Sequence, residues 1–243
     1  MKNQIPQKAK EELTPDGKLR VGVNLGNFLL VNKDPATGEL RGVVPDLAAE
    51  LARRLGTTAE LIAYPGAGQV ADAAGTGAWD VGFIGAEPQR AAVIEFTLAY
   101  VEIPATYLVP AGSPIRAIEE VDRPGVRIAT AARSAYDLYL SRSLKHAELV
   151  RAEGLPASYD LFVKEKLDAL SGLLPRLTSE VTRLPGARIL DGKFTAIQQA
   201  IGTPKARSAA AAYLRDFVAD IKSSGLVANL IAKHDVKGIT VAA

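Results

Sequence analysis

The sequence contains no cysteine among its 243 residues. Disulfide bonds, thiolate catalysis and cysteine-ligated metal sites are therefore excluded. The absence does not decide between an oxidising compartment and the cytosol, because a chain without thiols is compatible with both.

Long hydrophobic runs are absent too. No stretch approaches the roughly 18 apolar residues of a membrane-spanning helix, so we expect a chain that does not span a membrane. Residues 1–17 (MKNQIPQKAKEELTPDG) lack the apolar core of an intact secretory signal. Two localisations stay open: a periplasmic protein whose signal was removed, or a cytoplasmic protein.

The motifs of several enzyme classes are also missing. The sequence has no HExxH, GxSxG, P-loop or GxGxxG pattern, and its two histidines lie far apart, at 146 and 234. A net charge of +2 without a dense Lys/Arg stripe does not suggest nucleic acid. We therefore expect no catalytic residue, no cofactor, no metal and no nucleic-acid partner.

The first hundred residues alternate between strand and helix patterns. Strands are predicted at 19–23 and 59–64, and a short apolar strand follows Asp80. Two short extended pieces joined by an Asp-Pro…Thr-Gly turn are predicted within 29–40. A helix is predicted from Pro45, with leucines at 47, 51 and 55 on one face and Gly56 as its C-cap. This alternation predicts a mostly parallel sheet with helices on both faces.

A second series of strands and helices begins near Ile118, and the polar residues 1–18 are predicted to form a solvated leader. Strands are predicted at 126–130, 148–152 and 188–190, with an extended stretch at 194–201. Helices are predicted at 135–146, 159–166 and 177–183, and two more within 204–233. No internal repeat is visible. The chain therefore reads as two αβ series followed by a helical tail.

The stretch Asp80–Arg90 (DVGFIGAEPQR) carries the strongest functional hypothesis. It reads as a short apolar strand, a glycine-containing break and a helix opening that places Arg90 at the mouth. Ligands of open α/β sheets bind beyond the carboxyl ends of the strands. Arginine offers a planar fork of donors that matches a carboxylate, so Arg90 is predicted to clamp an anion.

Several stretches together carry a resemblance to a known family. They are LRVGV at 19–23, GELRGVVPDLAAELARRLG at 38–56, AGTGAWDVGFIGAEPQRAAVIEFTLAY at 74–100, RIATAARSAYDLYL at 127–140 and KLDAL at 166–170. In order and spacing the chain resembles the bacterial extracellular solute-binding proteins of ABC importers, in their amino-acid-binding branch. The resemblance covers about residues 19–235.

The resemblance implies an α/β, two-lobed, periplasmic-binding-protein-like fold of type II. Each lobe would be a mostly parallel sheet flanked by helices. Lobe 1 would be discontinuous, at 19–107 plus 203–243, and lobe 2 would be 108–202. Crossover strands near Tyr107–Pro110 and Ala200–Thr203 would form a hinge. The expected protein is a monomer that closes over a small solute between its lobes and delivers it to an ABC permease.

The family site, carried over residue by residue, gives a role to Arg90 and to the loop after the first strand. Arg90 matches the arginine that pairs with the ligand's α-carboxylate. Asn24, Asn27 and Phe28 fall where the family lines its site with an acid and an aromatic ring. Asn24 stands in the place of the acid and cannot neutralise an ammonium group. Turn chemistry for the asparagines and core packing for Phe28 are the alternatives.

The next candidate is Glu87, with the two residues before it. Gly85, Ala86 and Glu87 occupy positions where amino-acid binders usually show hydroxyl side chains and backbone donors. Glu87 is interpreted either as a partner for a cationic group of the ligand or for Arg90, or as an exposed acid near a helix start that favours the helix dipole.

A second anion site is expected in lobe 2. Arg133, Ser134, Ala135 and Tyr136 lie at a helix start, where free N–H groups favour anions. Arg133 replaces a family glycine and either faces the ligand or points outward. Asp137 competes for the same positive helix end.

Leu173 is the clearest departure from the family. It stands five positions after Asp168, where amino-acid binders carry the aspartate that grips the α-ammonium. Leucine cannot do so, which favours a small anionic solute, amino-acid-like or carboxylic. The alternatives are a cyclohexadienyl-type dehydratase on the same fold, with Glu87 as general acid, and a cytosolic sensor or scavenger.

Overall fold

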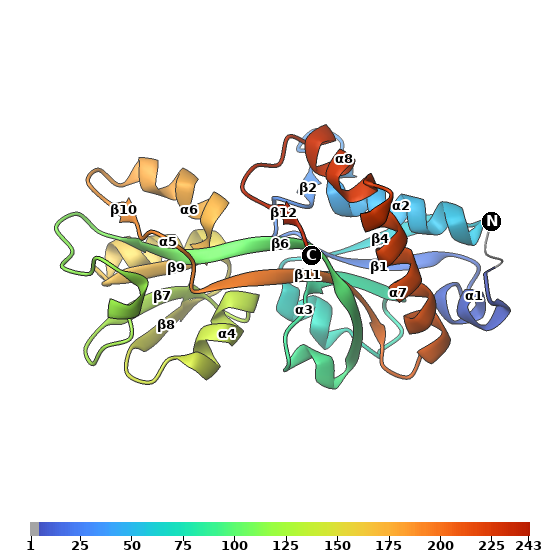
Figure 1. Cartoon of the computed structure of the whole chain (residues 1–243), viewed down its shortest axis with the longest axis horizontal. Coiled ribbons are helices and arrows are strands. Elements are labelled where there is room, and N and C mark those ends of the chain that lie inside the picture. Colours follow the sequence, from blue (N-terminus) through green and yellow to red (C-terminus); the bar gives the residue numbers. More distant parts are fainter. Residues whose placement is uncertain (1–4) are drawn as a thin grey trace. The chain divides into compact units, whose positions relative to one another are not determined.

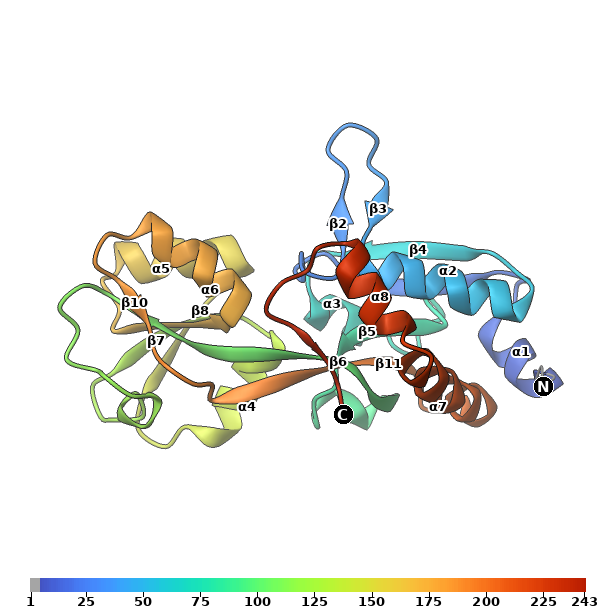
Figure 2. The same cartoon turned by 45° about the horizontal axis from the view of Figure 1, so that its top comes forward.

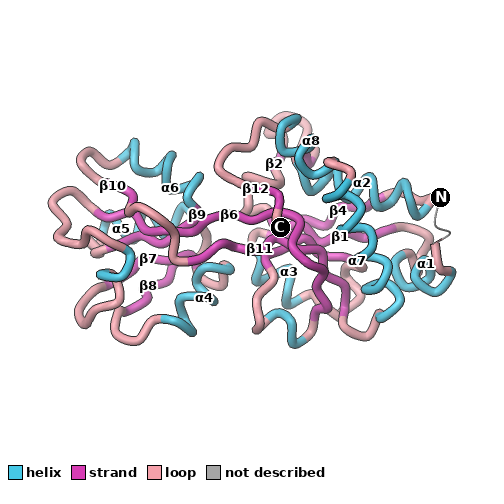
Figure 3. The backbone as a smooth tube through the Cα atoms, viewed as in Figure 1, coloured by secondary structure: helices cyan, strands magenta, loops and turns pink. Residues whose placement is uncertain are grey.

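A computed structural model describes residues 5–243, and these divide into two compact units. Unit 1 runs to Val101 and resumes over Gln198–Ala243, and unit 2 is Glu102–Ile197. The sequence had placed the boundaries near residues 107 and 203. The chain passes between the units within β6 (Ile94–Val109) and β11 (Thr195–Pro204), both continuous strands in Figure 3.

The sheet of unit 1 is built around three parallel strands. β1 (Leu19–Asn24) lies between β4 (Ala59–Tyr64) and β5 (Val81–Gly85) and is parallel to both. β11 continues the sheet antiparallel to β5, and β12 (Thr240–Val241) pairs with β6. The expectation of a parallel sheet therefore holds for the first three strands and ends at β11.

Helices cover both sides of this sheet, as the alternating pattern predicts. In Figure 1, α2 (Val43–Leu55) runs along one side and α3 (Ala67–Asp72) along the other. α2 ends at Gly56, whose φ of 68° is the left-handed cap conformation.

The tail and an early hairpin complete unit 1. α8 (Leu226–Lys233) contacts both α2 and α7 (Ser208–Ser223). The predicted hairpin is formed by β2 (Asn32–Lys33) and β3 (Leu40–Arg41), which stand out from the unit in Figure 2.

The leader that was expected to be solvated is folded over part of its length. α1 (Gln7–Leu13) buries Ala9 and Leu13 and packs on α7. Arg207 Nη1 donates to the Glu12 carbonyl oxygen at 2.8 Å, and the Ala210 N–H donates to Glu12 Oε2 at 2.8 Å. The prediction was wrong because two spaced apolar positions suffice when another helix covers them. Residues 1–4 of that leader lie outside the described residues.

Unit 2 repeats the pattern of a central parallel sheet. β7 (Arg127–Ala131) lies between β8 (Glu148–Ala152) and β9 (Ala169–Leu173) and is parallel to both. β9 and the short β10 (Arg188–Ile189) pair with β6, both antiparallel to it.

Consecutive residues of β7 pack into two different apolar clusters in unit 2. Ile128 packs with Leu140 of α4 (Ala135–Ser143), and Ala129 packs with Phe162 of α5 (Leu155–Lys164). α4 and α5 therefore cover opposite faces of the sheet. The shorter helices are α6 (Leu174–Glu180) and the 3-10 turns η1 (Arg90–Ala92), η2 (Ile118–Glu120) and η3 (Val181–Arg183).

Two surveys of residues 5–243 bear on the class of protein. No helix in this range is both long enough and apolar enough to cross a membrane. The same described residues hold no cluster of three or more His, Cys, Asp or Glu side chains suited to a metal ion.

Candidate functional site

Arg90 lies just beyond the carboxyl end of β5 and is buried, with 4% of its surface exposed. Its Nη1 donates to the Gly85 carbonyl oxygen at 2.7 Å, and its N–H donates to the Glu87 carbonyl oxygen at 2.9 Å. The helix that the sequence predicted here is only the three-residue turn η1, because β6 begins at Ile94. The guanidinium is thus held against the last residue of a central strand.

Gly85, Ala86 and Glu87 follow from the end of the same strand. Gly85 pairs with Gln199 of β11, and the Ala86 N–H donates to the Gln198 carbonyl oxygen at 2.8 Å. The backbone donor expected at Ala86 is therefore engaged within the sheet. Glu87 is 6% exposed, so the alternative of an exposed acid near a helix start is wrong.

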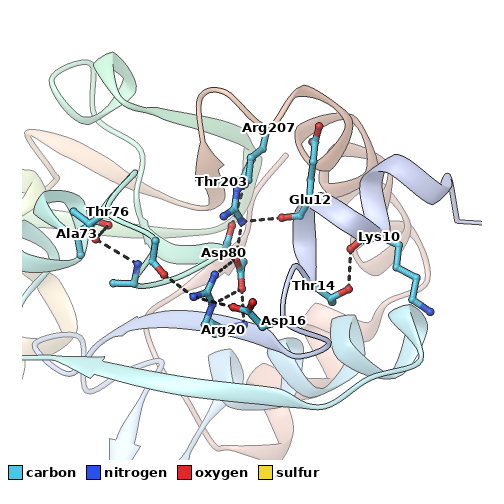
Figure 4. Close-up of polar contacts among 12 residues, drawn as sticks. Lys10, Glu12, Thr14, Asp16, Arg20, Ala73, Thr76, Asp80, Thr203 and Arg207 are labelled. Atoms are coloured by element: carbon cyan, nitrogen blue, oxygen red, sulfur yellow. Dashed lines mark hydrogen bonds and ion pairs between the residues drawn. The ribbon is translucent and has the colours of Figure 1, made fainter.

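The base of β5 is fixed by a buried ionic network, drawn in Figure 4. Asp80 is fully buried and accepts hydrogen bonds from Arg20 Nε at 3.0 Å and Nη2 at 2.8 Å. Arg207 Nη1 donates to the same carboxylate at 2.6 Å, and Thr203 Oγ1 donates to the Asp80 carbonyl oxygen at 2.9 Å.

This network joins four elements of unit 1 at the amino end of the strand that leads to Arg90. Arg20 lies in β1 and Thr203 lies in β11. Asp80 immediately precedes β5, and Arg207 immediately precedes α7. It fixes the direction and register of β5. The sequence did not reveal it, since its hydrogen-bonded partners are up to 127 positions apart.

The loop after β1 contains two asparagines whose side chains differ in their hydrogen bonds. Asn24 Oδ1 accepts the Gly26 N–H at 2.9 Å, so this side chain serves the turn alternative. Asn27 is 6% exposed, and no described residue gives its Oδ1 a hydrogen bond. Phe28 is half-buried.

The start of α4 in unit 2 is capped from within. Ser134 Oγ accepts the Asp137 N–H at 3.1 Å, and Asp137 Oδ2 accepts the Arg133 N–H at 2.8 Å. The first two helical residues, Ala135 and Tyr136, carry N–H groups that a helix leaves without intrahelical partners. The competition expected from Asp137 is therefore real, and binding of a ligand anion at this helix start stays a prediction.

Arg133 itself has a φ of 59° and an exposed side chain. This left-handed conformation explains why a glycine is usual at this position in the resembled family. Whether the guanidinium contacts a ligand stays a prediction.

Leu173 is the last residue of β9, pairs with Ala105 of β6 and is 6% exposed. Its side chain is part of the buried surface at the carboxyl end of a parallel strand. No carboxylate is present at this position, in agreement with the departure noted from the sequence.

Sequence reasoning missed Thr130 at this edge, and it named Tyr136 only as part of the helix start. Thr130 Oγ1 in β7 is buried and no described residue hydrogen-bonds to it, and the Tyr136 hydroxyl in α4 is buried beside the Ser134 side chain. Burial raises the pKa of the Tyr136 hydroxyl. The only available signal was a threonine in an otherwise apolar strand end, ATA at 129–131.

Comparisons with known proteins agree with the resemblance. The family model for bacterial extracellular solute-binding proteins, family 3, matches residues 19–236. A search of curated proteins found no match to the chain.

Solved structures of similar fold include a P235GK mutant of ArgBP from T. maritima, with 21% identity and a TM-score of 0.77 over 93% of this chain and 99% of that one. Solute receptors for L-cysteine of Neisseria gonorrhoeae give 18% identity and a TM-score of 0.78, over 96% of each chain.

A third solved structure belongs to an ancestral amino-acid-binding protein described as a precursor of cyclohexadienyl dehydratase. It shares 21% identity, with a TM-score of 0.75 over 92% of this chain and 98% of that one. At such identities these likenesses establish the fold. The predicted α/β fold of the type II periplasmic-binding class is confirmed.

Proposed function

The chain belongs to family 3 of the bacterial extracellular solute-binding proteins, and from this premise we propose that its solute is a small carboxylate held by Arg90. The observation that carries the proposal is the buried guanidinium at the end of β5, 4% exposed and donating to the Gly85 carbonyl oxygen. A guanidinium has five N–H donors in a planar fork, a geometry that matches the two oxygens of a carboxylate.

Burial is what makes such a clamp strong. Each charge-assisted hydrogen bond contributes about 1.5–3 kcal/mol, more than its neutral counterpart. The Asp80 network and the β11 pairing hold the strand that carries Gly85, so the clamp is fixed before the solute arrives. This preorganisation lowers the entropy lost on binding.

Two departures from the family pattern favour an anion over a standard amino acid. Asn24, in the place of the family's acid, is engaged in its own turn, and Leu173 stands where the ammonium-binding aspartate is usual. Burying an ammonium without a carboxylate partner is strongly unfavourable. The proposed solute is therefore carboxylic rather than an ordinary α-amino acid.

By family membership, we propose delivery of the solute to an ABC permease and a periplasmic location. The two strands that pass between the units, β6 and β11, are the proposed hinge. No residue is assigned a catalytic role in this proposal.

Thermal-shift screening against amino acids and organic acids tests the proposal. Binding to the native state adds RT ln(1 + [L]/Kd), about 2.7 kcal/mol at a hundredfold excess over Kd. Organic acids are expected to give the largest shifts. If only cationic or neutral compounds raise the unfolding midpoint, the proposal is wrong.

Variants of Arg90 locate the site. Arg90→Gln is expected to abolish the shift, and Arg90→Lys to leave part of it, because lysine keeps the charge but loses the fork. Arg215→Gln, at an exposed arginine of the same unit, is the matched control and should bind as the wild type does.

The dehydratase alternative is tested separately. Glu87 is a buried carboxyl close to Arg90 in sequence, which is the only observation that favours it. Incubation with prephenate or arogenate should leave both unchanged. Turnover that is lost in Glu87→Gln would contradict a protein that only binds.

A further inference from the structure

Asn27, in the loop after β1, carries a buried side-chain oxygen that the chain leaves without a hydrogen bond. The residue is 6% exposed, and its Oδ1 has no partner among residues 5–243. A buried acceptor without a partner is unfavourable, and an apolar side chain of similar size, such as leucine, would avoid that cost. The asparagine therefore calls for a donor from outside the chain.

The backbone places Asn27 on the side of β1 that faces β5. The Arg20 carbonyl oxygen accepts the Asp80 N–H at 2.9 Å, so every second residue of β1 from Arg20 onwards directs its carbonyl group towards β5. Asn24, the last residue of β1, is one of these, and its carbonyl oxygen accepts the Asn27 N–H at 3.2 Å. Asn27 is therefore turned back towards the carboxyl end of β5.

The Arg90 guanidinium lies on the side of β5 that faces β1. The Ala86 N–H donates to the Gln198 carbonyl oxygen, on the side of β11. The preceding residue, Gly85, therefore directs its own carbonyl group away from β11 and towards β1. Arg90 Nη1 donates to that carbonyl oxygen at 2.7 Å. The guanidinium and Asn27 thus lie beyond the carboxyl ends of two neighbouring strands, on the sides that face each other.

The spacing of the two strands limits which part of a solute can reach Asn27. Neighbouring strands lie about 4.8 Å apart. In a carboxylic acid held by Arg90, the carbon next to the carboxylate, the 2-position, is therefore the one closest to Asn27. An amide oxygen accepts a hydrogen bond from a hydroxyl group there, whereas a 2-oxo group has no hydrogen to donate. An ammonium group would donate, but the neutral amide cannot balance its charge.

We propose that Asn27 accepts a hydrogen bond from the 2-hydroxyl group of the solute, so that the site selects 2-hydroxy acids over 2-oxo acids and 2-amino acids. This inference rests on the proposed function, because it concerns the group next to the carboxylate that Arg90 holds. It assigns Asn27 as a specificity-determining residue. All the contacts that carry it lie within unit 1.

Solutes that differ only at the 2-position test the selection by calorimetric titration. Suitable sets are L-lactate, pyruvate and L-alanine; 2-hydroxyglutarate, 2-oxoglutarate and L-glutamate; and phenyllactate, phenylpyruvate and L-phenylalanine. In the set that binds best, the hydroxy acid should have a Kd about tenfold below that of the oxo acid, the value of one hydrogen bond. Equal or tighter binding of the oxo or amino acid, or no binding by any hydroxy acid, overturns the inference.

The variant Asn27→Leu tests the residue itself. It should raise the Kd of the hydroxy acid about tenfold and leave that of the oxo acid nearly unchanged, while the unfolding midpoint without solute stays the same or rises. Asn229→Leu, at an exposed asparagine of α8 in the same unit, is the matched control and should bind as the wild type does.

The variant Asn27→Asp gives a second readout. Its carboxylate supplies the partner that an ammonium group needs, so at pH 7 the amino acid should gain affinity relative to the hydroxy acid. An unchanged ratio of the two Kd values in Asn27→Asp would overturn the inference. So would a fall in the unfolding midpoint of Asn27→Leu with an equal rise of all three Kd values, because the amide would then have a structural role.

The variant Arg90→Gln separates failure of the inference from failure of the proposed function. Carboxylic acids that lose binding in Arg90→Gln but bind Asn27→Leu as they bind the wild type would contradict only the inference. Hydroxy acids that bind Arg90→Gln as tightly as the wild type would contradict the proposed function, whatever the effect of Asn27→Leu.

Discussion

In each unit an aspartate just before a buried strand makes the same pair of contacts with the backbone of an arginine, but the surroundings of the two aspartates differ. In unit 1, the Asp80 N–H donates to the Arg20 carbonyl oxygen, and Asp80 Oδ2 accepts the Arg20 N–H at 3.0 Å. In unit 2, the Asp168 N–H donates to the Arg127 carbonyl oxygen, and Asp168 Oδ2 accepts the Arg127 N–H at 2.8 Å. Each aspartate immediately precedes a fully buried five-residue strand, β5 or β9.

The difference lies in what surrounds each carboxylate. Asp80 is fully buried and binds two guanidinium groups, whereas Asp168 is half-buried beside the exposed Arg127, which gives it only a backbone N–H. The same backbone contacts therefore belong to a buried ionic network in unit 1 and to a partly exposed hydrogen bond in unit 2. The comparison teaches that the energetic weight of a contact follows its burial and its partners.

The ends of the same two strands also differ. β5 leads to the buried Glu87 and Arg90, and β9 leads to Leu173 and to Arg176, which is paired with Glu180. β5 thus leads to a buried guanidinium that donates to a backbone carbonyl oxygen, while β9 ends at a buried apolar side chain.

The largest effect is expected from removing the buried carboxylate. Asp80→Asn leaves two guanidinium groups in partly buried positions without their anion, which costs about 3–5 kcal/mol. Asp168→Asn should cost about 1 kcal/mol, the value of one hydrogen bond. Urea unfolding of both variants measures the difference, and similar losses would break the comparison.

A smaller effect is expected from one partner of Asp80. Arg207→Gln removes the bonds to Asp80 and to the Glu12 carbonyl oxygen, but Arg20 still neutralises the carboxylate. The expected loss is about 1–3 kcal/mol. Arg127→Gln, at the exposed counterpart in unit 2, should change stability by less than about 0.5 kcal/mol. Equal losses in the same urea titrations would contradict the account.

The smallest effect is expected from a surface cluster of unit 1, and it should depend on pH. The hydrogen bond from Arg53, with further help from Arg54, lowers the pKa of Glu50 from 4.5 to about 2. The stabilisation is therefore complete above about pH 5 and is lost as the pH falls towards 2.

Glu50→Gln should lose about 1 kcal/mol at pH 7, since solvent screens these charges, and almost nothing near pH 2. Unfolding midpoints of the two proteins from pH 7 to pH 2 should converge. A gap that stays constant would show that Glu50 does not act through its charge.

Sequence patterns predicted the elements that rest on local rules. The spacing of Leu47, Leu51 and Leu55 predicted the helix α2, and Gly56 predicted where it ends. The turn residues predicted the β2–β3 hairpin. The order of strands and helices predicted two αβ series. These features depend on neighbours in the chain, and local periodicity and turn chemistry report them.

What could not be predicted depends on residues far apart in the chain. The helix α1 is stabilised by α7, about 200 positions away, and Asp80 by Arg207. The loss of the predicted helix at Arg90 follows from the early start of β6. The unsatisfied Thr130 hydroxyl is a property of packing around it, and a strand pattern alone does not report hydrogen-bond partners.

Calorimetric titration of Arg90→Gln with the strongest binder from the solute screen tests the central claim most directly. Loss of two charge-assisted bonds is expected to cost at least about 3 kcal/mol, more than a hundredfold in Kd. The urea midpoint of the solute-free variant should show that it is still folded. A Kd within threefold of the wild-type value in a folded Arg90→Gln protein would contradict the claim that Arg90 holds the solute's carboxylate.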